Sequence, residues 1–210
     1  MRSISSGLAG ATLSAPFANW LSGWWPIRYV PLLAVFSLLL VAPGKRTEAQ
    51  ATAEEYRVKA AFIFHFAQLV DWPSEKPAGA DNSLVLCTLG EDPFQGVLED
   101  TVAGKAIGNR VLRIRHLGDP QDMQACQIVF LGRGQSKRIP MLVSTLHNAP
   151  VLTVGETDGF LDAGGMIDFF LEDNKLRFAV NLDAAESADL KIGSRLLVLA
   201  QRVVRESHGK

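Results

Sequence analysis

Runs of apolar residues predict three short buried strands. Leu84–Leu89, Gln127–Leu131 and Val151–Val154 are apolar at nearly every position, as expected of strands covered on both faces. Arg110–Arg115 instead alternates basic and apolar residues, which predicts a strand with one solvated side, near the edge of the sheet. Helical segments are expected between the strands, from Pro93 to Asp100, from Pro120 to Ala125 and from Ser136 to His147.

Strands that alternate with short helices predict an α/β fold. We expect a mainly parallel central sheet with helices on both faces, Rossmann-like or flavodoxin-like, because crossovers between parallel strands are right-handed. Asp92 is the expected N-cap of the first helix, with Pro93 at its first position. Gly104–Asn109 is expected to be a loop.

The last third of the chain predicts an antiparallel C-terminal hairpin about a turn at Asp173-Asn174. This register pairs Leu171 with Leu176, Phe169 with Phe178, and Ile167 with Val180, so one face is wholly apolar. A short helix should follow from Asp183 to Ala188, and Leu190–Gly193 should then cross the molecule. Ser194 is expected to cap a terminal helix whose apolar face comprises Leu196, Leu199, Ala200 and Val203.

A long helix is predicted within Glu54–Pro73. Its apolar residues form two stripes that nearly close around the helix, so it should be buried on most sides from about Ala60 onward. Pro73 lacks a backbone donor and disfavours helical geometry at Trp72, so the helix should end before it. The stripes are Tyr56, Ala60, Ile63 and Ala67, and Val58, Phe62, Phe66 and Leu69.

The first fifty residues predict a leader for export. Val30–Ala42 is an apolar run of about 13 residues, which is shorter than the roughly 20 that a membrane-spanning helix needs. Ala49-Gln50-Ala51 has the small-x-small pattern of a cleavage site. We therefore predict that residues 1–51 are a signal peptide and that residues 52–210 form the mature α/β domain. An uncleaved N-terminal anchor is the alternative, and translation could also begin downstream of Met1.

Charge argues against nucleic acid as a partner. The chain has 21 basic and 22 acidic residues; cleavage would remove four bases and one acid, leaving 17 and 21 and a net charge of −4. The bases that do cluster, Arg110, Arg113 and Arg115, alternate with apolar residues along a predicted strand. A nucleic-acid surface needs concentrated positive charge, and none is evident.

Sequence signatures of an enzyme are missing. There is no phosphate-loop motif and no Gly-x-Ser-x-Gly elbow, and Lys137 stands where the third glycine of a dinucleotide fingerprint would follow Gly132-Arg133-Gly134. Asp168 and Glu172 are four apart on a predicted strand, so they are expected to be solvent-side charges. We predict neither enzymatic activity nor a cofactor. A metal site is not expected either, because the histidines are far apart and there is no Cys-x-x-Cys: His65, His116, His147 and His208.

One stretch of the sheet edge could bind a small ligand. The loops that begin at Gly90, Gly132 and Gly155 leave the carboxyl ends of their strands, where open α/β sheets usually hold ligands. Backbone donors of Gly134–Ser136 could hold an anion, with Arg133 adding charge. A plain strand-to-helix turn is the alternative. The candidate crevice residues are Gly132, Arg133, Gly134, Gln135 and Ser136.

The chain has two cysteines, Cys87 within the first strand and Cys126 just before the third. In an exported protein such a pair suggests a disulfide. Two buried thiols are the alternative, since mid-strand and strand-start positions could lie farther apart than the ~7 Å Cα limit.

Short motifs along the predicted domain resemble those of the YfiR-like family of periplasmic proteins, whose named member represses a membrane-bound diguanylate cyclase. The resemblance extends over residues 54–204. The motifs are Tyr56, Lys59-Ala60-Ala61-Phe62, Phe66, Trp72-Pro73, Leu152–Glu156, Gly159-Phe160, Gly164–Ile167, Leu176–Phe178, Asn181-Leu182 and Ser194–Leu197.

The resemblance implies a function and a partner. It implies a periplasmic repressor that binds the periplasmic sensor domain of a membrane diguanylate cyclase, lowering cyclic di-GMP and so regulating biofilm formation. It favours a disulfide between Cys87 and Cys126 and leaves a homodimer open. The membrane would be contacted only through the partner or an uncleaved leader. The named member has a further cysteine pair in the segment that corresponds to Leu152–Gly165, and this chain has none there. A periplasmic receptor for an anion or amino acid is the alternative function.

Overall fold

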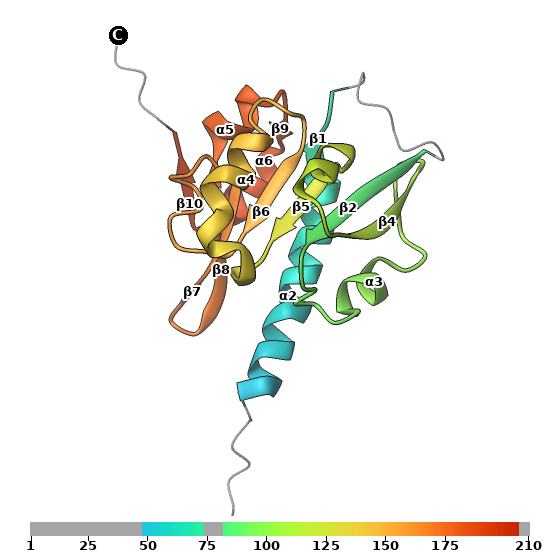
Figure 1. Ribbon diagram of the computed structural model, residues 1–210, viewed down its shortest axis with the longest axis vertical. Coiled ribbons are helices and arrows are strands. Elements are labelled where there is room, and N and C mark those ends of the chain that lie inside the picture. Colours follow the sequence, from blue (N-terminus) through green and yellow to red (C-terminus); the bar gives the residue numbers. More distant parts are fainter. Residues whose placement is uncertain (1–47, 74–81, 206–210) are drawn as a thin grey trace, which may run out of the picture. The chain divides into compact units, whose positions relative to one another are not determined.

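The computed structural model describes residues 48–73 and 82–205 (Figure 1). The apolar run of the predicted leader lies outside the described residues. The first described element is the helix α2, Glu48–Leu69, which contains both residues of the predicted cleavage bond, Ala51 and Thr52. Within the described ranges, every helix is too short or too polar to cross a membrane.

The centre of the fold is an eight-stranded, mostly parallel sheet with the order β10-β8-β7-β6-β5-β2-β4-β3. All neighbours from β4 through β7 pair in parallel, as do β8 and β10. The mixed α/β class with a mainly parallel sheet is therefore confirmed. The strands are β2 Ser83–Leu89, β3 Ala106–Ile107, β4 Arg110–Leu117, β5 Ile128–Leu131, β6 Leu152–Gly155, β7 Ile167–Glu172, β8 Lys175–Asn181 and β10 Arg202–Val204.

Short helices connect these strands, and a second, two-stranded antiparallel sheet joins β1, Val70–Asp71, to β9, Lys191–Ile192. The helical elements after α2 are α3 Val97–Val102, η1 Pro120–Ala125, η2 Arg133–Arg138, α4 Ile139–Thr145, α5 Leu182–Ser187 and α6 Ser194–Leu199.

Two hydrophobic cores receive alternate residues of β2. Leu84 and Leu86 join the core that contains the buried residues of α2. Val85 and Cys87 join the core that contains the buried residues of α4. Because successive side chains of a strand point to opposite faces, β2 is buried on both, which explains its unbroken apolar sequence.

The hairpin formed by β7 and β8 has the register that the sequence predicts. Ile167 pairs with Val180, Phe169 with Phe178, and Leu171 with Leu176. Asp173 and Asn174 have φ angles of 50° and 57°, the left-handed conformation that a two-residue turn of this kind requires. Leu171 is 54% exposed, so the apolar face opens to solvent near the turn.

The long helix is buried on one face rather than on most sides. Phe66 of the second stripe is buried together with the first stripe, but Ala61, His65 and Gln68 are exposed. The helix ends at Leu69, before Pro73 as expected, and the chain then forms β1 against β9.

Two predicted boundaries near α3 are wrong. Asp92 caps a turn, accepting hydrogen bonds from the backbone N–H groups of Phe94 (3.0 Å) and Gly96 (3.3 Å). Gly96 has a φ of 87°, so the helix starts only at Val97. The expected loop 104–109 contains β3, which pairs antiparallel with Arg110 and Val111.

The C-terminal helices also differ from expectation. The helix α5 spans Leu182–Ser187 where Asp183–Ala188 was expected, and Asn181 caps it, because its side chain accepts a hydrogen bond from the backbone N–H of Ala184 (3.0 Å). The terminal helix α6 ends at Leu199, which is 64% exposed, and Val203 lies in β10. The helix ends there because the backbone groups at the outer edge of β8 need hydrogen-bond partners. Residues 202–204 pair with them as β10.

The segment between β5 and β6 contains two helices where one was expected. A 3-10 helix, η2, covers Arg133–Arg138, and the α-helix α4 covers Ile139–Thr145. The turn after Asp119 matches its prediction, because the Asp119 side chain accepts a hydrogen bond from the backbone N–H of Gln121 (2.9 Å).

Candidate functional site

A pocket of about 480 Å³ lies at the carboxyl ends of β2 and β5, beside the first turns of α2. Two of the three predicted loops line it; from the third, which begins at Gly155, no residue does. The lining residues are Thr52, Tyr56, Leu89, Glu91, Asp92, Pro93, Gln95, Gly132, Arg133, Gly134 and Gln135. Four of the five predicted crevice residues are therefore at this pocket, and Ser136 is not among its lining.

A buried ionic network lies next to this pocket. Lys59 of α2, whose side chain is 1% exposed, contacts the carboxylates of both Glu55 and Glu156. Tyr56 donates its hydroxyl hydrogen to Glu156 Oε1 (2.9 Å), and the Lys59 Nζ lies 4.5 Å from the Tyr56 ring centroid. Glu156 follows β6, so the network fixes the first half of α2 to the end of the sheet.

Arg133 completes the network from the pocket side. Its backbone N–H donates to Glu156 Oε1 (3.1 Å), and its Nη2 donates to Glu55 Oε1 (2.9 Å). Its Nε lies 3.8 Å from Glu156 Oε2. Two carboxylates and two cations thus balance each other, and little of the Arg133 charge is left for an anionic ligand.

The charges of this network shift two pKa values. Burial, and then the Glu156 carboxylate, raise the pKa of Tyr56 above its usual value, so the phenol stays protonated and keeps its donor role. Burial alone would lower the pKa of Arg133, but the carboxylates of Glu156 and Glu55 outweigh it and raise the pKa. Both side chains are therefore fixed donors across the physiological pH range.

Sequence reasoning missed the network. Lys59 belongs to one of the family motifs, and it lies on the buried side of α2 between Tyr56 and Ile63. Glu55 stands four residues before Lys59, the helical spacing of an ion pair, and this local signal was available. Glu156 is 97 positions away from Lys59, and only the fold brings it there.

The two cysteines form a disulfide, as the family resemblance implied. Cys87 and Cys126 are joined, with their Cα atoms 6.1 Å apart, within the range for such bonds. Because β2 and β5 are neighbours, mid-strand Cys87 meets the residue that precedes β5. The bond closes a segment of 39 positions across the core on the α4 side.

Asp168 is a half-buried acid beyond the network. Its Oδ1 is buried without a hydrogen-bond partner among the described residues. Burial, and then the charge of Asp158, raise the pKa of Asp168 to about 7, while Arg202 acts in the opposite direction. The prediction that Asp168 is a simple solvent-side charge is therefore wrong.

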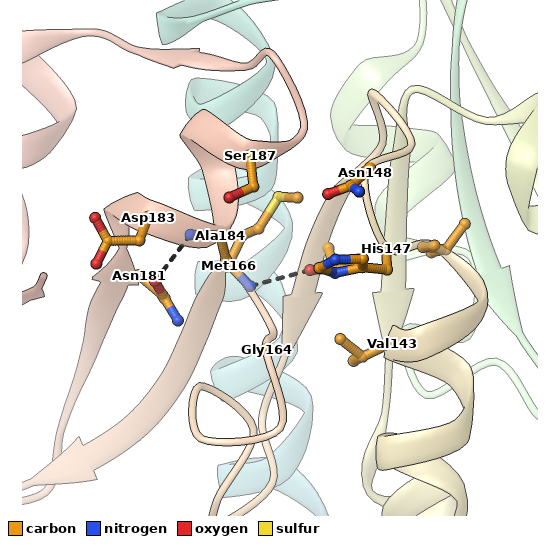
Figure 2. A pocket seen from close by; sticks show the side chains of 11 residues that line it. Val143, His147, Asn148, Gly164, Met166, Asn181, Asp183, Ala184 and Ser187 are labelled. Carbon is orange, nitrogen blue, oxygen red and sulfur yellow. Dashed lines mark hydrogen bonds between the residues drawn. The ribbon is translucent and has the colours of Figure 1, made fainter. Parts of the chain in front are cut away.

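A second pocket, of about 280 Å³, lies between the end of α4 and the start of α5 (Figure 2). Val143 and Met166 give it an apolar side, and His147, Asn148 and Ser187 give it a polar rim. The Thr153 hydroxyl oxygen accepts a hydrogen bond from the backbone N–H of Met166 (3.0 Å) and closes part of its wall. No sequence feature predicted this pocket.

These features define a class of protein: a disulfide-linked α/β domain with a ligand-sized pocket at the carboxyl edge of its sheet. The chain belongs to the YfiR/HmsC-like family, whose model (DUF4154) matches residues 56–201. Membership implies a periplasmic regulator of diguanylate cyclase, and the family's members are regulators rather than enzymes.

Other comparisons add little. No curated protein matches the chain. An ABC domain in complex with L-Trp from Streptococcus pneumonia is 9% identical, with a TM-score of 0.43, and the match covers 60% of this chain and 56% of that one. A conserved domain protein from Vibrio cholerae O1 biovar El Tor is 10% identical, with a TM-score of 0.48, covering 69% and 60%. The chain thus spans less than two thirds of either structure.

Proposed function

We propose that this protein represses a membrane-bound diguanylate cyclase by binding the cyclase's periplasmic sensor domain. The observation that carries the proposal is the family match, which runs from Tyr56 in α2 to Gln201 beside β10 and so covers nearly all of the described fold. Repression follows if the protein binds the inactive state of the cyclase more tightly than the active state. Cyclic di-GMP then stays low until a signal weakens that preference.

The buried network and the disulfide support a binding role. Lys59 and Glu156 resemble catalytic residues in being buried and charged, but each is already engaged by partners within the fold. Such a network holds α2 at a fixed place on the sheet, and a rigid surface binds a partner at lower entropic cost. This rigidity supports the proposal of a preorganised binding surface.

Export is part of the proposal. We propose cleavage after Ala51 and release of the domain into the periplasm, and the disulfide supports this because such bonds persist in oxidising compartments. N-terminal sequencing of the protein from a periplasmic fraction should begin at Thr52. A longer chain found only in the membrane fraction would show instead that the leader is kept as an anchor.

Reconstitution in a foreign bacterium tests repression. The foreign bacterium produces this protein together with one candidate cyclase at a time from the protein's native organism. Each candidate is a membrane protein that has a periplasmic segment and a cytoplasmic Gly-Gly-Asp/Glu-Glu-Phe domain, and cyclic di-GMP is measured. We expect one such cyclase to lose most of its output and to co-purify with the protein. A version without residues 1–51 is the matched control and should leave output high. Equal output with and without the exported protein, for every candidate cyclase, would refute repression by binding.

A second candidate function is reception of a small ligand, favoured by the pocket of about 480 Å³ at the predicted sheet edge. Since Arg133 is paired while Glu91 and Asp92 add negative charge, a ligand that carries both charges, such as an amino acid, suits the pocket better than a simple anion. The two functions are compatible, because a ligand could tune repression.

A thermal-shift screen of amino acids and anions tests this second function. A true ligand should raise the melting temperature of the wild type by several degrees, and Gly134→Trp should abolish that rise. Gly134 lines the pocket, and a Cβ added there would meet no atom within 4 Å, so the larger side chain should obstruct the pocket without disturbing the core. A ligand shift that is equal in Gly134→Trp, or no shift with any compound, counts against the pocket.

A further inference from the structure

Three side chains with metal-ligating atoms meet at the carboxyl ends of β2 and β4. They are Asp92 from the loop after β2, Glu99 from α3 and His116 from β4, and one donor atom of each lies within 4.8 Å of the others. His116 was set aside in the sequence because the other histidines are distant. The fold supplies carboxylates as its neighbours instead.

The imidazole of His116 is held at both nitrogens. Its Nδ1 lies 2.7 Å from the hydroxyl oxygen of Thr88, which is 1% exposed and directly opposite His116 in the β2–β4 register. Its Nε2 lies 2.7 Å from Glu99 Oε1. Metal-binding histidines usually donate their second ring N–H to an oxygen in this way, which leaves the other nitrogen's lone pair for the metal.

The tautomer of His116 decides what can lie beside Glu99. With the proton on Nδ1, Nδ1–H donates to Thr88 and the Nε2 lone pair faces the Glu99 carboxylate, where a cation can bind both; with the proton on Nε2, the ring donates to Glu99 instead. The second oxygen of Glu99, Oε2, is buried and has no hydrogen-bond partner among the described residues. The Glu99 side chain as a whole is 39% exposed, so a water or a cation can reach this unpaired oxygen.

Asp92 is preorganised to supply the third ligand. The backbone N–H groups of Phe94 and Gly96 hold its two oxygens in place, and a carboxylate that accepts two such bonds still has lone pairs to offer. Asp92 also lines the pocket of about 480 Å³, so a cation at this cluster would be reachable from it. His116 is 46% exposed in its side chain, which leaves a path for an ion from solvent.

We propose that Asp92, Glu99 and His116 bind one divalent transition-metal ion, for which Zn²⁺ is the best match. An imidazole nitrogen with two carboxylates suits zinc, whereas calcium and magnesium prefer oxygen alone. Water would complete the coordination. The ion would join α3, β4 and the loop after β2, and this inference does not depend on whether the protein represses a cyclase.

Titration calorimetry with ZnCl₂ tests the site, using tag-free protein in the processed form that the cell produces, freed of metal by a chelator. We expect one Zn²⁺ per chain, and Co²⁺ should give visible absorption bands of a site with fewer than six ligands. His116→Gln and Glu99→Gln should each weaken Zn²⁺ binding by at least about tenfold. Thr88→Val, which removes only the hydroxyl that positions the imidazole, should weaken it by about 10–100-fold.

Matched controls separate this cluster from other histidines. His65→Gln and His147→Gln should bind Zn²⁺ as the wild type does, because neither residue is in the cluster. Circular dichroism and melting temperature in chelator should show that every variant is folded. The proposal is overturned if the wild type shows no binding up to about 1 mM Zn²⁺, or if His116→Gln and Glu99→Gln bind as tightly as the wild type.

Discussion

Lys59 shows how one residue can specify the position of a helix. It is among the largest fully buried side chains of the described fold, and its charge is matched by Glu55 and Glu156. A buried ion pair adds little stability over an apolar pair of the same size, but removing one partner leaves the other charge stranded. The network is therefore better regarded as a constraint on where α2 lies than as a source of net stability.

Replacing Lys59 by Met should consequently lower the free energy of unfolding by about 3–5 kcal/mol, because the Glu156 carboxylate would remain buried without its cation. Urea denaturation measures the loss. Arg57→Met is the matched control on the same helix; its ion pair with Glu54 is exposed, and its loss should cost no more than about 0.5 kcal/mol. Similar losses in both variants would show that the Lys59 network has no special role.

Asp168 should make stability depend on pH. Its pKa is about 7 in the folded protein, whereas an ordinary aspartate has a pKa of 3.8. Between these two pH values the folded state therefore binds a proton that the unfolded state has lost. Stability from this group is therefore greatest below about pH 4, falls as the pH rises to about 7, and is level above that.

Asp168→Asn should remove that dependence and stabilise the protein at pH 8 by about 1–2 kcal/mol. This is less than the free energy that corresponds to the whole pKa shift, because the side chain is only half-buried and solvent screens its charge. Denaturation at pH 5 and pH 8 measures it. Asp162→Asn, at an exposed position in the connection that precedes β7, should change neither value. An Asp168→Asn protein that is less stable than wild type at pH 8 would contradict the argument.

At the scale of elements, the connection between β6 and β7 is built around one aromatic ring. Phe160 is fully buried, and a Cβ added at either Gly155 or Gly165 would overlap its ring. The two glycines therefore let the backbone pass on either side of Phe160, and this packing explains why the motif contains glycine at these positions.

Gly165→Ala should therefore destabilise the fold by about 1–3 kcal/mol, through overpacking against Phe160. Gly134→Ala is the control: a Cβ there would meet no atom within 4 Å, and its effect should be within about 0.5 kcal/mol. Differential scanning calorimetry of both variants decides the matter, and equal melting temperatures for Gly165→Ala and the wild type would contradict the packing.

The disulfide links elements of the core on the α4 side. Closing a segment of 39 positions should contribute about 4 kcal/mol by restricting the unfolded chain. Unfolding in the presence of reductant should show this loss, and the double variant Cys87→Ala/Cys126→Ala should be destabilised similarly and respond no further to reductant. A wild type whose stability is unchanged by reductant would argue against the bond.

At the scale of the whole molecule, the pattern of apolar residues predicted the class of fold because each long strand carries its own signal. The hairpin register was also predictable, since a two-residue turn and the wholly apolar face allow only one pairing. The strands that were missed, β1, β3, β9 and β10, have two or three residues each. Such strands form because a neighbouring edge offers backbone groups, and that information lies in the partner strand.

The candidate site was predictable only in part. Loops at the carboxyl ends of parallel strands share one edge, so the position of Gly132–Gln135 at a pocket there was predictable, while ligand binding by these residues stays a prediction. The Lys59–Glu156 pair and the Asp92–Glu99–His116 cluster combine residues from separate elements, and no local pattern reports which elements will meet. The sequence also does not show whether a charged side chain is paired. Arg133 was expected to attract anions, but the fold pairs it with Glu55 and Glu156.

The cellular level of cyclic di-GMP in a strain that lacks this protein tests the central claim most directly. Mass spectrometry of extracts should show a several-fold rise on deletion, and restoring the exported protein should reverse it, whereas restoring a version without residues 1–51 should not. A level that is unchanged by deletion, under conditions in which the wild type produces the protein, would contradict the role of periplasmic repressor.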